Sequence, residues 1–138
     1  MELKDIADLM LNLSDNINFY WNFYVFTVIG IISWLASLKA NLGNLLKTLV
    51  TMAFLFFVAL NINGLVTSYS LSAAMLLELK VVMSKATTIH TEDIKKFIQG
   101  FSLNIHVYIV WITHIVVDIC VLLFIWSNKL RNDLAVKT

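Results

Sequence analysis

The sequence predicts an all-α integral membrane protein, because hydrophobic residues dominate and charged residues are confined to short segments. Of the 138 residues, 59% are hydrophobic and 14% are charged, whereas about 25% are charged in a typical soluble domain. Residues 17–38 and 48–77 carry no charged side chain, and residues 104–127 carry only Asp118. Each run is long enough to cross a bilayer as a helix, which takes about 20 apolar residues.

We expect four helices in a single membrane domain that covers residues 1–138. The first span covers 17–38. Tyr20, Trp21 and Tyr24 lie near its start and Trp34 lies near its end. Aromatic rings of this kind favour the two membrane–water interfaces, so their positions suit a helix that crosses the bilayer.

The second uncharged run is longer than one span needs, and the sequence predicts a tight turn within it. Asn61 and Gly64 lie near its middle, and both residue types favour turns. The second span then covers residues 46–60 and the third helix covers 65–86. The alternative is one continuous helix over 45–86, bent near Gly64, which reduces the number of spans to three.

The first and last segments are expected to be helices that reach outside the bilayer. Residues 1–15 have an amphipathic pattern, with Ile6, Met10 and Leu13 on one face. This pattern suits a contact with a protein partner as well as binding flat on the membrane. The last helix is expected over 91–130, which is about 60 Å at 1.5 Å per residue. Because the bilayer needs about half of that length, its N-terminal part is expected to protrude.

The basic residues give an expected orientation. In the four-span arrangement one side of the membrane carries six of them and the other side carries four. The positive-inside rule then places both termini outside the cytoplasm, whereas the three-span arrangement gives five on each side and no preference. The formal net charge of +1 argues against nucleic-acid binding as the main role of the chain.

A stripe of polar residues along the last helix is the main candidate site. Its six members are spaced alternately by four and three positions, so they fall within an arc of about 80° on a helix. Ionisable groups inside a membrane cost about 2.5–3.5 kcal/mol on insertion scales and usually face a bundle interior or water. The stripe consists of Gly100, Asn104, Val107, Trp111, His114 and Asp118.

Two interpretations of this stripe stay open. In the first, it lines a pore or a proton path between about four to six copies of the chain, arranged as a cyclic homo-oligomer. A ring of Asp118 carboxylates then favours cations, and Trp111 with Val107 forms an apolar collar that closes the path by dewetting. In the second, the stripe is a contact between helices, in which Gly100 permits close approach and the polar groups bond across the interface.

Basic residues gather around the connection between the third and last helices. They can receive an anionic ligand, such as a nucleotide, or anionic lipid headgroups. The alternative is a solvated helix surface, because Glu78, Glu92 and Asp93 lie among them. The basic residues are Lys80, Lys85, His90, Lys95 and Lys96.

The sequence gives no sign of an enzyme. It has no glycine-rich phosphate loop, no nucleophile motif and a single cysteine, Cys120. His106, His114 and Asp118 do not match the helical metal-binding patterns His-x-x-x-His or Glu-x-x-His. We therefore expect no catalytic residue, no metal and no cofactor.

At the level of architecture the chain resembles the small multi-pass effectors of bacterial anti-phage systems. The polar stripe and the basic residues around Lys85 and Lys95 carry this resemblance. It implies a bacterial inner membrane, an oligomeric pore and control by a nucleotide signal, and no residue role is carried over. Colicin immunity proteins are similar in size and span count, but they block a pore.

We therefore expect a non-enzymatic, homo-oligomeric membrane protein that forms a gated ion pathway. The alternative is an immunity-type or accessory protein that binds another membrane protein through the polar stripe. The oligomeric state in detergent separates the two, since a ring supports the pathway and a monomer supports the accessory role.

Overall fold

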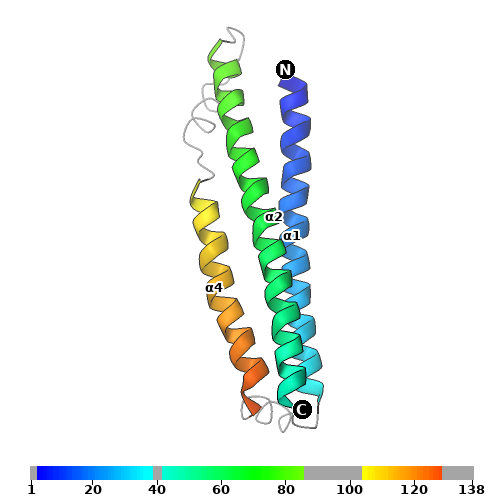
Figure 1. The fold of residues 1–138 in the computed structure, drawn as a ribbon. Coiled ribbons are helices and arrows are strands. Elements are labelled where there is room, and N and C mark those ends of the chain that lie inside the picture. Colours follow the sequence, from blue (N-terminus) through cyan, green and yellow to red (C-terminus); the bar gives the residue numbers. More distant parts are fainter. Residues whose placement is uncertain (1–2, 39–41, 86–103, 129–138) are drawn as a thin grey trace.

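Three long helices make up the parts of the chain that the structure describes. This structure is a computed structural model, and it describes residues 3–38, 42–85 and 104–128. The helices are α1 (Leu3–Ser37), α2 (Asn44–Lys85) and α4 (Asn104–Trp126), as Figure 1 shows. Each contains a segment that is long and apolar enough to cross a membrane. The predicted all-α membrane class is confirmed at this level, with three candidate spans in the described residues.

Helix α2 is the central helix of the bundle. It runs antiparallel to α1 and to α4 and packs along both, whereas the described parts of α1 and α4 contact each other over a shorter stretch (Figure 1). Its buried residues recur every three or four positions, which places them on one face of the helix. They include Phe54, Val58, Asn61, Leu65, Ser68, Ser72 and Leu76.

The predicted turn near Gly64 is wrong, because α2 continues without a break from Asn44 to Lys85. The separate segments 46–60 and 65–86 are therefore parts of one helix, which is the continuous alternative. Asn61 is 3% exposed, and its Nδ2 donates a hydrogen bond to the Tyr20 carbonyl of α1 at 2.9 Å. A tight turn at this depth would also leave backbone groups without partners in hydrocarbon.

Gly64 has a packing role in this helix. A Cβ atom added to it would lie 2.5 Å from ring carbons of Tyr20, which is too close for two nonbonded carbons. The missing side chain therefore leaves a notch on α2 that the Tyr20 ring fills. Small residues allow this kind of close approach between helices in lipid.

The boundaries predicted for the first helix also change. A separate amphipathic helix over 1–15 is not present, because α1 runs unbroken through this region to Ser37. Ile6 and Leu13 are buried while Asp5 and Asp8 are exposed, so the apolar face of this segment packs inside the bundle and the acidic face points outward. The described part of the last helix covers Asn104–Trp126, and its predicted end near residue 130 lies outside the described residues. Its predicted start at 91 and its protruding part lie outside them as well.

Helices α1 and α2 are both longer than the hydrocarbon layer of a bilayer is thick. α1 has 35 residues and α2 has 42, or about 52 Å and 63 Å at 1.5 Å per residue, whereas the hydrocarbon layer is about 30 Å thick. The end of α1, the start of α2 and the end of α4 lie together, and we call this the Asn44 end (Figure 1). The exposed acidic residues Asp5, Asp8 and Glu78 lie toward the opposite end, which we call the Lys85 end.

This arrangement corrects the predicted sidedness. Because α1 and α4 both run antiparallel to α2, the start of α1 and the end of α4 lie at opposite ends of the bundle (Figure 1). The fold therefore does not support the prediction that both termini lie on the same side of the membrane. Among the described residues, Lys47 lies toward the Asn44 end and Lys80 and Lys85 lie toward the other end.

The first prediction concerns the notch at Gly64. Gly64→Ala should lower the free energy of unfolding by about 1–3 kcal/mol, because the methyl group overpacks the Tyr20 contact. Gly30→Ala is the matched control, since a Cβ there meets nothing within 4 Å, and it should be neutral or stabilise by up to about 1 kcal/mol. The measurement is unfolding in mixed micelles followed by circular dichroism.

A second variant makes this result specific. Tyr20→Ala removes the ring, so adding Gly64→Ala to it should cost much less than Gly64→Ala costs alone. Equal effects of Gly64→Ala in both backgrounds would contradict the packing role of this glycine.

The second prediction concerns the number of spans. In a Cys120→Ala background, single cysteines at Asp5 and Glu78 should react with an impermeant maleimide from the same side of sealed vesicles, because both lie toward the Lys85 end. A cysteine at Asn44 should react from the other side. Labelling of Asp5 and Glu78 from opposite sides would restore the four-span arrangement.

Candidate functional site

The polar stripe of α4 divides between the interior and the edge of the bundle. His114 is 0% exposed and Asp118 is 9% exposed, so both face the other helices. Trp111 is 48% exposed and Val107 is half-buried. Gly100 and the side chain of Asn104 lie outside the described residues. The structure therefore brings two of the six stripe residues into a buried site.

Three side chains from two helices form this site, which we call the Asp118 cluster: Tyr24 of α1 with His114 and Asp118 of α4. The Tyr24 hydroxyl donates a hydrogen bond to Asp118 Oδ1 at 2.7 Å. His114 Nδ1 lies 3.5 Å from Asp118 Oδ2. The Tyr24 and His114 rings are 4.0 Å apart between centroids, with planes tilted by 52°. Each carboxylate oxygen therefore has a polar neighbour.

The two ring nitrogens of His114 are the unusual feature of the cluster. Both are fully buried and make no hydrogen bond to a described residue, although Nδ1 lies near the Asp118 carboxylate. Buried polar atoms nearly always have a partner, so each exception calls for an explanation such as a bound water, an ion or a functional role. Nε2 is therefore the position in the Asp118 cluster that is open to a further hydrogen bond.

Trp21 of α1 connects the Asp118 cluster to a second polar group. Its ring stacks on His114, with centroids 6.0 Å apart and planes within 23°. Its Nε1–H donates to the Tyr69 hydroxyl of α2 at 3.2 Å. The Tyr69 ring in turn stacks on His106 of α4 at 5.5 Å. We call Tyr69 and His106 the outer pair, because they lie closer to the Lys85 end.

Sequence reasoning missed most of these neighbours. The sequence places Tyr24 in an interfacial aromatic belt with Tyr20 and Trp21, whereas in the structure Tyr24 is buried and bonded to Asp118. A tyrosine deeper in a span needs a partner for its hydroxyl, and this requirement is the signal that could have identified it. His106 lies off the stripe by helical spacing, and only the structure relates it to Tyr69.

Lys47 holds the opposite end of α4 against α2. It is 5% exposed, and its Nζ donates to Asn128 Oδ1 at 2.9 Å and to the Trp126 carbonyl at 3.4 Å. Trp126 Nε1 donates back to Thr51 Oγ1 at 3.1 Å. A cation at a helix C-terminus compensates the partial negative charge of the last carbonyls. These contacts fix α4 at the Asn44 end of the bundle.

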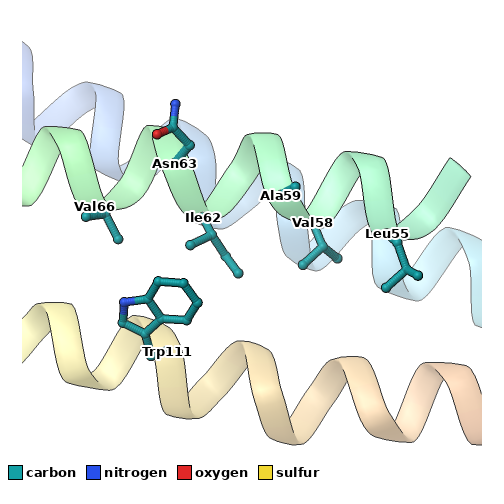
Figure 2. Close-up of a pocket in the computed structure, with 7 residues that line it drawn as sticks. All are labelled: Leu55, Val58, Ala59, Ile62, Asn63, Val66 and Trp111. Atoms are coloured by element: carbon teal, nitrogen blue, oxygen red, sulfur yellow. The ribbon is translucent and has the colours of Figure 1, made fainter. Parts of the chain in front are cut away.

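A groove of about 430 Å³ lies between α2 and α4 at Trp111. Figure 2 shows the Trp111 ring directed from α4 toward α2 across this groove. Its lining is almost entirely apolar, so it suits hydrocarbon rather than a hydrated ion. The lining residues are Leu55, Val58, Ala59, Ile62, Asn63, Val66 and Trp111.

The predicted basic surface is only partly described. Lys80 is half-buried on α2, and Lys85 is the last residue of that helix. His90, Lys95 and Lys96 lie outside the described residues, so the anionic-ligand hypothesis stays a prediction. Within the described ranges, no three His, Cys, Asp or Glu side chains are grouped closely enough to hold a metal ion.

Comparison of the chain with protein-family models, characterised proteins and solved structures found no match. The Asp118 cluster and its neighbours are therefore the features of the chain that bear on its function.

Proposed function

We propose that this protein forms a gated cation pathway across a membrane and that the Asp118 cluster is its ion-coupled site. The observation that carries the proposal is a carboxylate and an imidazole buried together inside a candidate span. Intramembrane ionisable residues are costly, and they commonly mark ion paths and proton relays.

The depth of the cluster supports this function. Asp118 lies eight residues before the end of the candidate span Ile105–Trp126 and 13 residues after its beginning, or about 12 Å and 20 Å along the axis. A hydrocarbon layer of about 30 Å that covers α4 therefore contains the carboxylate well inside it. A group that served only as an interfacial anchor would lie closer to one end of the helix.

The packing of the helices suggests how the pathway is gated. α1 and α4 each pack along α2, and the Tyr24–Asp118 hydrogen bond joins them directly. Separation of α1 from α4 would break that bond and expose the Asp118 cluster to water. Because Lys47 fixes the Asn44 end of α4, this motion is expected mainly toward the Lys85 end.

Self-association belongs to the same proposal. Three packed helices enclose no wide water-filled channel, so conduction requires either this local opening or several copies around an axis. Binding of a nucleotide or another anion near Lys85, Lys95 and Lys96 is the proposed control. The bacterial inner membrane is the proposed location, and a role in anti-phage defence is the proposed context.

The second candidate is an accessory or immunity-type protein that binds another membrane protein. One observation favours it: Asp118 and Tyr24 find partners within a single protomer, so this site does not need an oligomer to be stable. In this case the groove beside Trp111 offers space for a side chain of the partner. A stable monomer in detergent, with no conductance, would support this candidate.

The third prediction tests the ion-coupled site. Asp118→Asn should lower cation conductance and cation selectivity in planar bilayers, because it removes the ionisable carboxylate but keeps its shape. Tyr24→Phe should raise basal conductance, because it removes the hydrogen bond that joins α1 to α4. Cys120→Ser, an exposed position two residues along α4, is the control and should behave as wild type.

Size in detergent and helix content should be measured for each variant. Unchanged conductance and selectivity in Asp118→Asn, with an intact fold, would contradict the role of the Asp118 cluster.

A further inference from the structure

The Asp118 cluster and the outer pair are two groups of polar side chains, and the side chain of Trp21 lies between them. His114 lies against one face of Trp21, and the indole N–H of Trp21 is donated to Tyr69. Tyr69 stacks on His106, which lies two residues from the start of α4. Polar groups therefore occur along α4 from His106 to Asp118, and the Trp21 ring lies between the outer pair and His114.

The chemistry of the Asp118 cluster does not suit a metal cation. Alkali and alkaline-earth cations require several oxygen ligands, typically six to eight for Ca²⁺ and near-octahedral coordination for Mg²⁺. The Asp118 cluster offers one carboxylate, one phenol and two imidazole nitrogens, and the Tyr24 and His114 rings pack 4.0 Å apart. The groove at Trp111 is lined mainly by apolar side chains, so it does not suit a hydrated cation.

The same groups suit a proton. A neutral imidazole accepts a proton at one nitrogen and releases one from the other. In His114 neither nitrogen makes a hydrogen bond to a described residue, but Nδ1 lies 3.5 Å from Asp118 Oδ2 and is therefore the nitrogen placed to pass a proton to the carboxylate. Nε2 is then the nitrogen that can accept the incoming proton. A proton that binds Nε2 is balanced by one that passes from Nδ1 to Asp118, and tautomer exchange restores the ring.

Trp21 cannot take part in such a relay, because an indole N–H is a donor only. Its ring stacks on His114 and its N–H is already donated to Tyr69, so in this state it separates the two groups of polar side chains. We infer that the conducted ion is the proton and that Trp21 is the gate between the outer pair and His114. This inference rests on the proposed pathway and names both its ion and its closing residue.

The test is proton entry into liposomes that contain purified protein and a pH-sensitive dye, driven by a potassium diffusion potential. Trp21→Ala should raise the rate at least about tenfold, which corresponds to about 1.4 kcal/mol removed from the barrier. Trp21→Phe should stay close to wild type, because its ring still separates the two groups of polar side chains. Trp34→Ala, an exposed tryptophan near the other end of α1, is the control.

Two further measurements make the result specific. Adding Asp118→Asn to Trp21→Ala should return the rate to that of protein-free liposomes. Sodium entry, followed with a sodium-sensitive dye, should not change in any variant.

The possible outcomes separate this inference from the proposed function. A rise in sodium entry equal to the rise in proton entry, still dependent on Asp118, would overturn the proton assignment and leave the cation pathway standing. Proton entry that Trp21→Ala leaves unchanged while Tyr24→Phe raises it would overturn Trp21 as the gate. No entry of either ion in any folded variant would overturn both proposals.

Discussion

The hydrocarbon core of a membrane offers no hydrogen-bond partners, so a polar side chain within a span is stabilised mainly by partners inside the protein. In this chain the Tyr24–Asp118 hydrogen bond meets that requirement between helices that otherwise contact each other little. It determines which face of α4 turns inward, since His114 follows Asp118 into the interior. The proposed gating depends on the same bond, because breaking it both unpairs the carboxylate and separates α1 from α4.

The contact between α1 and α2 follows the same physical rule with different residues. The Asn61 amide is paired with a backbone carbonyl of Tyr20, and the Tyr20 ring fills the notch at Gly64. These contacts join the two helices at one level, one turn before the residues that reach α4. α1 therefore presents Tyr20 to α2 and Tyr24 to α4 from positions four apart. The rigid α1–α2 pair gives α4 a fixed surface, to which it is held by Lys47 at one end and by Asp118 nearer its middle.

The sequence predicted the membrane class and the polar stripe because both depend on composition and periodicity. It failed at 61–64 because asparagine and glycine favour turns in water but serve helix contacts in lipid, and the sequence alone does not contain the opposing Tyr20. Periodicity identified the face of α4 that carries His114 and Asp118. It did not reveal whether that face meets another copy or another helix of the same chain. The hydrogen bonds Trp21–Tyr69 and Tyr24–Asp118 join residues 48 and 94 positions apart, which local patterns do not encode.

The most direct test of this account is a double-mutant cycle between Tyr24 and Asp118. The free energy of unfolding would be measured in mixed micelles for Tyr24→Phe, Asp118→Ala and the double variant, with Tyr24→Phe and Cys120→Ala as the control pair. Hydrogen bonds between membrane helices contribute about 0.6 kcal/mol on average and up to about 1.7 kcal/mol. Because the Tyr24–Asp118 bond is short and has a charged acceptor, the account predicts a favourable coupling energy of about 1–1.7 kcal/mol for the test pair and additivity for the control. Additive effects within about 0.5 kcal/mol in the test pair would contradict it.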